Sequence, residues 1–117
     1  MVRLGIYVAG PYSADNVITV LNNMRKGIQA SDKLMAMGYS PFCPFLDYHF
    51  QLQSEHVLQD FYDYSMTWLE KSDIVVCLPG WIQSKGCRAE VARAKELSIP
   101  IFDLDEFITM FGVATND

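Results

Sequence analysis

The sequence has few of the residues that build metal centres and disulfide frameworks. Its 117 residues include three cysteines, Cys43, Cys77 and Cys87, which are widely spaced and form no CxxC pair. The two histidines, His49 and His56, are too few for a convincing metal site, and we interpret both as loop or surface residues. The odd cysteine count predicts no disulfide framework and no thiolate zinc site. We therefore expect no metal and a reduced, cytoplasmic protein.

Long apolar runs and an excess of positive charge are missing as well. The longest apolar stretch, Ile74–Ile82, contains Pro79 and Gly80 and is far shorter than the roughly 20 residues of a membrane-spanning helix. The first residues lack the apolar run and cleavage site of a secretory signal. Nine Lys and Arg against fourteen Asp and Glu give a net charge of −5, which repels nucleic-acid backbones and anionic membranes. We expect neither duplex nucleic acid nor a membrane as partner.

The glycine motifs that bind phosphates in common cofactor sites are absent too. Neither GxGxxG nor GxxxxGK[ST] occurs, so the dinucleotide and P-loop interpretations lose their phosphate turns. A receiver domain of a response regulator would need an acidic residue at the carboxyl end of its third strand, whereas Asp73 lies at the start of that segment. We expect no cofactor.

The residues that are present alternate between strand-like and helical patterns. Half of them are apolar and a fifth are charged, a globular composition whose length suits one domain over residues 1–117. The pattern predicts strands at Leu4–Ala9, Tyr39–Phe45, Asp73–Leu78 and Pro100–Leu104, and helices from Asp15 or Asn16 to Gly38, at Ser54–Leu69, from Ser84 to about Ser98, and near the C-terminus. Residues Asp47–Gln53 are expected to form a loop. The fold class is α/β, with a doubly wound parallel sheet and helices on both faces.

The flavodoxin-like strand order 2-1-3-4 is the simplest arrangement for so few strands. Its topological switch point lies between the first and third strands, where ligands of such sheets bind. The loops that leave these strands are Gly10-Pro11-Tyr12-Ser13 and Pro79–Ser84, the second of which includes Gly80 and Trp81. These two loops are the predicted site loops.

Glu90 is the most informative single residue. At 100° per residue it falls within the apolar stripe formed by Cys87, Val91, Ala94 and Leu97. A carboxylate there is costly unless it is paired or used. It either forms an ion pair with Arg93, three residues on, or faces the crevice as a functional group.

Three segments together resemble the nucleoside 2-deoxyribosyltransferase superfamily, which includes nucleoside 5′-monophosphate N-glycosidases and small bacterial and phage relatives. They are Ile6–Tyr12, Ser72–Val76 and Ser84–Glu90, the last with the pattern S-x-G-x-x-x-E through Ser84, Gly86 and Glu90. The resemblance spans roughly Ile6 to Leu104. It implies that Glu90 is the nucleophile, that Tyr7 positions it, and that Ser84 contacts a 5′-phosphate at a helix N-terminus.

The sequence departs from this family at two places. Ser65 stands where the family usually has an aspartate that protonates the leaving base, so the proton would come from Asp47 or from a water held by Ser65. Pro11 and Ser13 stand where the monophosphate branch has Ser and Arg, which weakens phosphate recognition. The expected site therefore comprises catalytic Glu90 and Tyr7, with substrate contacts from Gly10, Pro11, Tyr12, Ser13, Asp47, Ser65, Gly80, Trp81, Ser84 and Gly86.

The resemblance implies cleavage or exchange of the N-glycosidic bond of a nucleoside or nucleoside 5′-monophosphate. The alternative is a nucleotide-binding or regulatory protein with the same fold and little or no catalysis. The partner would be a small nucleoside or nucleotide, together with further copies of the chain in a homodimer or larger assembly. Apolar residues of the C-terminal helix that a small sheet leaves uncovered, Phe107, Ile108, Met110 and Phe111, point to the same self-association.

Overall fold

Four short strands form one parallel sheet in a computed structural model of the chain, which describes residues 2–112 and, within these, leaves out the side chains of residues 47–49. The strands are β1 (Gly5–Ala9), β2 (Ser40–Phe42), β3 (Ile74–Cys77) and β4 (Ile101–Asp103). Their order is β2-β1-β3-β4, and each neighbouring pair is parallel. The predicted order 2-1-3-4 is confirmed.

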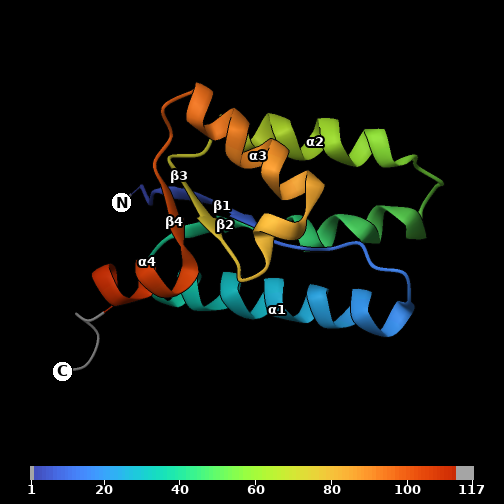
Figure 1. Cartoon of the computed structure of the whole chain (residues 1–117), viewed down its shortest axis with the longest axis horizontal. Helices are drawn as coiled ribbons and strands as arrows, with labels where there is room; N and C mark the ends of the chain where they lie inside the picture. The colour runs from blue at the N-terminus through green and yellow to red at the C-terminus, as the bar shows by residue number, and fades with distance from the viewer. Residues whose placement is uncertain (1, 113–117) are drawn as a thin grey trace.

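Helices cover both faces of the sheet, as Figure 1 shows. One face packs against α1 (Val17–Ala36) and α4 (Leu104–Phe111), and the other against α2 (Leu58–Glu70) and α3 (Lys85–Glu96). None of the helices in the described part of the chain combines the length and the hydropathy that crossing a bilayer requires.

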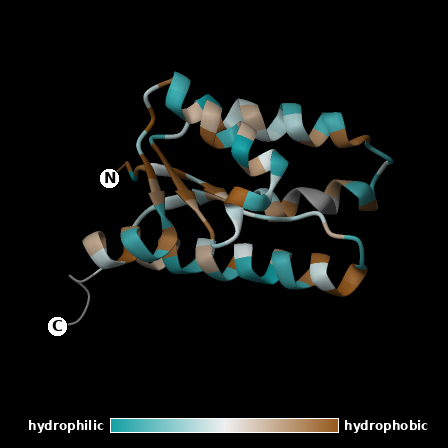
Figure 2. Cartoon of the chain, in the orientation of Figure 1, coloured by the Kyte–Doolittle hydropathy of each residue, from teal (hydrophilic) through white to brown (hydrophobic). Residues whose placement is uncertain are grey.

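The two cores follow from the alternation of side chains along β1 and β3. Ile6, Val8 and Val76 lie in the core on the α1 side, whereas Tyr7 and Val75 lie in the core on the α2 side. Hydrophobic residues are accordingly concentrated along the central strands in Figure 2.

Two predicted boundaries are wrong. The segment expected as a loop forms the 3-10 helix η1 (Pro44–Leu52), whose first turn accommodates Pro44 because no amide donor is needed there. The second helix begins at Leu58 rather than Ser54. The Gln51 side chain bonds the backbone of His56, and the Asp60 carboxylate accepts the Val57 N–H, so the chain enters the helix four residues later.

The C-terminal helix is better covered than its sequence predicts. Phe107 is fully buried in the core on the α1 side, where Phe102, Phe111 and Tyr39 surround its ring. Its inclusion among the uncovered residues is therefore wrong. Met110 and Phe111 are exposed, and self-association of the chain stays a prediction.

The closest packing constraint in the core on the α1 side lies where α1 crosses η1. A Cβ built at Gly27 would lie 2.1 Å from Cδ2 of Phe45, so the Phe45 ring rests directly on the helix backbone. Phe45 is 2 % exposed and has little room to move. Glycine is required here by the neighbouring ring and not by its backbone angles.

We expect Gly27→Ala to destabilise the protein by about 1–3 kcal/mol, the usual cost of overpacking. Helix propensity alone predicts the opposite sign, a gain of about 1 kcal/mol, so urea unfolding decides between the two effects. Asn22→Ala, at an exposed position of the same helix, is the matched control and should be neutral or slightly stabilising. A Gly27→Ala protein as stable as the native chain would contradict the packing argument.

Candidate functional site

A cavity of about 760 Å³ opens at the carboxyl ends of β1 and β3. This is the topological switch point of the sheet, as the strand order predicts. Both predicted site loops contribute to it, together with residues of α1, η1, α2 and α3. The predicted site residues that line it are Gly10, Pro11, Tyr12, Ser13, Ser65, Gly80, Ser84, Gly86 and Glu90.

Tyr7 contacts Glu90 at the wall of this cavity but is not itself among the described lining residues. Tyr7 is fully buried on β1, and its hydroxyl donates a hydrogen bond to Oε2 of Glu90. Glu90 is half-buried on α3 and lines the cavity. The hydroxyl thus fixes the orientation of the one carboxylate that the described residues bring to the cavity.

Arg93, the alternative partner of Glu90 in the sequence, points elsewhere. Its Nε lies 2.9 Å from Oε2 of Glu70, and its Nη1 lies 3.1 Å from Oε1 of Glu96. These contacts tie α3 to α2 and to its own next turn. The geometry therefore favours the crevice-facing interpretation of Glu90.

The N-terminus of α3 forms another part of the wall. Ser84 is its N-cap, as predicted, and its Oγ accepts the Cys87 N–H at 3.3 Å. The first amides of a helix have no partner within the helix, so this end favours an anion. Lys85 lines the cavity beside them, a contribution that the sequence analysis missed.

Gly86 allows an aromatic side chain to lie close to this helix end. A Cβ there would be 3.3 Å from Cε1 and 3.4 Å from the hydroxyl oxygen of Tyr62. Tyr62 comes from α2 and lines the cavity. The glycine of the S-x-G-x-x-x-E pattern therefore permits close contact between α2 and α3.

The first site loop is fixed by contacts with both neighbouring layers. A Cβ at Gly10 would lie 2.7 Å from Cδ1 of Leu78, so glycine lets the end of β1 approach β3. Asn23 of α1 donates its Nδ2–H to the Tyr12 carbonyl at 3.0 Å. These contacts position Pro11 and Ser13 at the cavity.

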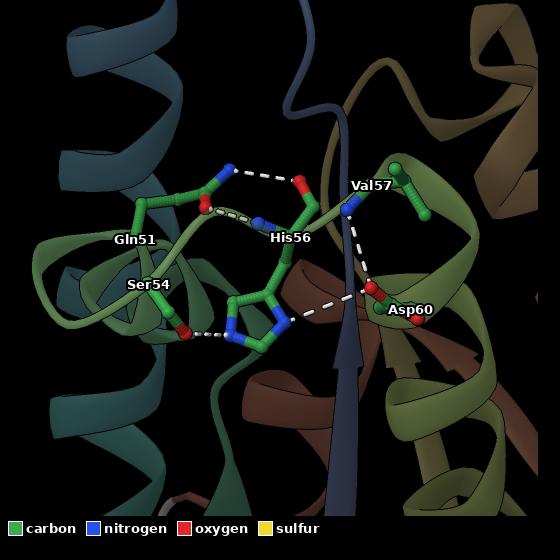
Figure 3. A network of polar contacts seen from close by, with 5 residues as sticks. All are labelled: Gln51, Ser54, His56, Val57 and Asp60. Carbon is green, nitrogen blue, oxygen red and sulfur yellow. Dashed lines mark hydrogen bonds and ion pairs between the residues drawn. The ribbon is translucent and has the colours of Figure 1, made fainter.

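The segment before α2 supplies a polar wall that the sequence analysis did not predict (Figure 3). The Gln51 side chain accepts the His56 N–H at 2.8 Å and donates to the His56 carbonyl at 3.2 Å. The His56 ring lies 3.1 Å from Ser54 Oγ through Nε2 and 3.6 Å from Asp60 Oδ2 through Nδ1. His56 lies in the loop between η1 and α2, as expected, and its half-buried side chain lines the cavity, a contribution that the sequence analysis did not predict.

Trp81 is the one predicted contact residue that is absent from the described cavity lining. Trp81 begins the short 3-10 helix η2 (Trp81–Gln83), packs against the core on the α2 side and donates its Nε1–H to Asp103 at 3.2 Å. Asp47 was also predicted as a contact residue, but its side chain lies outside the described residues. Ser65 does line the cavity and is 8 % exposed.

The buried thiols near the site are not nucleophiles at neutral pH. Burial, together with smaller effects of Cys87, Asp103 and Glu90, raises the pKa of Cys77 to about 12. Burial also raises the pKa of Cys87 to about 11, partly opposed by its hydrogen bond with Ser84. A thiol reacts as its thiolate, and burial disfavours that form at both cysteines.

Comparison with known proteins yields one family and one fold. A solved 2-deoxyribosyltransferase from the psychrotolerant bacterium Bacillus psychrosaccharolyticus is similar at a TM-score of 0.61 and 16% identity, over 85% of this chain and 70% of that one. At this identity the likeness concerns the fold. No curated protein matches the sequence. Residues 4–103 match the model of a family described as a domain of unknown function, DUF4406. Since this match covers most of the sequence, the chain belongs to the DUF4406 family.

Proposed function

We propose that the protein cleaves or exchanges the N-glycosidic bond of a nucleoside or nucleoside 5′-monophosphate, with Glu90 as nucleophile. The observation that carries the proposal is the Tyr7–Glu90 hydrogen bond at the wall of the switch-point cavity. The likeness of the fold to a 2-deoxyribosyltransferase and the family resemblance of the three sequence segments support it.

The reaction proceeds through two displacements. A Glu90 oxygen attacks the anomeric carbon, the carbon–nitrogen bond breaks, and its electron pair leaves with the base, which takes up a proton. Water or a second base then displaces the glutamate from the glycosyl ester, so configuration is retained overall. Water gives hydrolysis, and a second base gives transfer. Tyr7 orients the carboxylate throughout.

We expect Glu90→Ala and Glu90→Gln to lower base release by at least about a thousandfold, because both remove the nucleophile. Chromatography of free base after incubation with a panel of nucleosides and monophosphates measures this loss. Glu96→Gln, an exposed change on the same helix, is the control and should retain wild-type rates. A Glu90 variant that keeps most of the activity would exclude this nucleophile.

Trapping of the intermediate gives an independent test of the same step. A 2-fluoro sugar analogue should leave a glycosyl adduct on the peptide that contains Glu90, detected by mass spectrometry. An adduct on another peptide would contradict the mechanism even if the variants are inactive.

Ser65 is the observation that favours the second candidate, a nucleotide-binding or regulatory protein of the same fold. It lines the cavity where the family resemblance implies an acid, and a serine is a poor proton donor. Among the described residues that line the cavity, His56 and Lys85 are the only ones with a side-chain nitrogen that can carry a positive charge. The binding role therefore predicts nucleotide affinity without base release.

We expect Ser65→Asp to raise base release at least about tenfold, because a positioned general acid contributes 10²–10⁴-fold. Ser65→Asn is the matched control, since it has nearly the same shape without the acid. The site is buried, so we also expect the aspartate to lower stability in urea unfolding. If Asp and Asn variants release base equally slowly, proton donation at this position is not what limits the reaction.

Lys85 decides how strongly a phosphate is preferred. Arg25 and Arg88 do not line the cavity, and Arg88 donates instead to the Ile82 carbonyl at 2.7 Å. The helix end alone contributes less than about tenfold to anion affinity, whereas a charge-assisted hydrogen bond from Lys85 adds to it.

We expect calorimetry to show monophosphate bound about ten- to hundredfold more tightly than the matched nucleoside, with Lys85→Gln removing most of that preference. Ser84→Ala should reduce it without abolishing it. Lys71→Gln, at the end of α2 and outside the cavity, should change nothing. Equal affinities for nucleoside and monophosphate would show that Lys85 does not bind the phosphate.

A further inference from the structure

A stack of three aromatic rings connects the surface to the candidate site. The Trp68 ring stacks on Phe42 with centroids 5.8 Å apart and planes 21° apart, and Phe42 stacks on Tyr7 at 5.6 Å and 22°. Trp68 is 44% exposed, whereas Tyr7 is completely buried. The inner end of the stack is the ring whose hydroxyl bonds Glu90.

The middle ring of this stack is held by its strand. Phe42 lies directly opposite Tyr7 in the parallel pairing of β1 and β2, so both side chains are on the face that α2 and α3 cover. Pro41 and Pro44 flank it closely in the sequence, and proline restricts both its own φ and the residue before it. These restrictions stiffen the chain on either side of Phe42, and the pairing with β1 holds Phe42 itself.

The plane of the Tyr7 ring matters because of how a phenol donates. The hydroxyl hydrogen of a phenol prefers the plane of the ring, so this plane decides the direction in which Tyr7 donates. The torsion that sets the plane is broad for tyrosine, which means that neighbouring groups must select it. The near-parallel Phe42 ring, stacked on Tyr7, favours one orientation of the Tyr7 ring plane.

We propose that Phe42 is a positioning residue of the candidate site: stacked between Trp68 and Tyr7, it holds the Tyr7 ring in the plane from which the hydroxyl reaches Glu90. Phe42 does not line the cavity and acts only through Tyr7. The catalytic consequence rests on the proposed function, but the effect on the Glu90 carboxylate does not.

The decisive measurement is the titration of the Glu90 carboxyl carbon by NMR, with the signal assigned by its loss in Glu90→Gln. A hydrogen bond to a carboxylate favours its charged form, so Tyr7→Phe should move the midpoint to higher pH. Phe42→Leu, which keeps apolar volume without the ring, should move it in the same direction by about half a pH unit or more. Phe42→Tyr, which keeps an aromatic ring at this position, should titrate with the wild-type midpoint of Glu90.

Tyr64→Leu is the matched control for lost aromatic packing. The Tyr64 ring contacts both Phe42, at 6.0 Å, and Trp68, at 6.5 Å, and the stack reaches Tyr7 through Phe42. The Tyr64→Leu variant should lower stability but move the Glu90 midpoint clearly less than Phe42→Leu does. Trp68→Leu, at the exposed end of the stack, tests the same idea if Phe42→Leu does not fold, and should give a smaller shift in the same direction.

Two outcomes would overturn the proposal. The first is a wild-type Glu90 midpoint in Phe42→Leu or, if that variant does not fold, in Trp68→Leu. The second is a shift of the midpoint in Tyr64→Leu as large as that in Phe42→Leu. If the wild-type protein releases base, kcat in Phe42→Leu should fall about tenfold with KM little changed, since small displacements of positioning groups cost rate. If it releases none, the proposed function fails, and the titration still decides the role of Phe42.

Discussion

The candidate site depends on keeping a carboxylate at the edge of an apolar core. Glu90 follows the buried Cys87 and precedes the buried Val91 on α3, where a charge is costly unless a donor satisfies it. The Tyr7 hydroxyl supplies that donor from the first strand, 83 positions earlier in the chain. The parallel arrangement of β1 and β3 brings the two together, because it aligns the end of the first strand with the loop that begins α3.

Much of this arrangement could be predicted from local pattern. The alternating strands and helices and the handedness of their connections left few strand orders to consider, and the observed order is the predicted one. Ser84 was recognisable as an N-cap, and Glu90 was noticeable because it interrupts an apolar stripe. The inferences on Ser84 and Glu90 use only residues within a few helical turns, and they give the direction of a side chain without its partner.

The parts that could not be predicted depend on contacts between distant segments. Gln51 holds the backbone of His56 and thereby delays the start of α2, which no helical periodicity encodes. Lys85 was not assigned to the site from the sequence, because α2 completes the cavity wall beside it. Phe107 appeared uncovered because its neighbours Tyr39 and Phe102 come from other elements.

The two walls of the cavity suit different halves of the proposed reaction. The α3 wall carries the Glu90 carboxylate, the proposed nucleophile. The opposite wall offers the Ser65 hydroxyl of α2 and, just before α2, the His56 imidazole, which contacts Ser54 and Asp60. Attack at the sugar needs only the carboxylate, but departure of the base needs charge relief on its nitrogen. On the proposed function, the poor proton donor Ser65 makes the cavity better suited to substrates whose base leaves with little proton assistance. On the proposed function, the leaving base therefore discriminates among substrates more strongly than the sugar does.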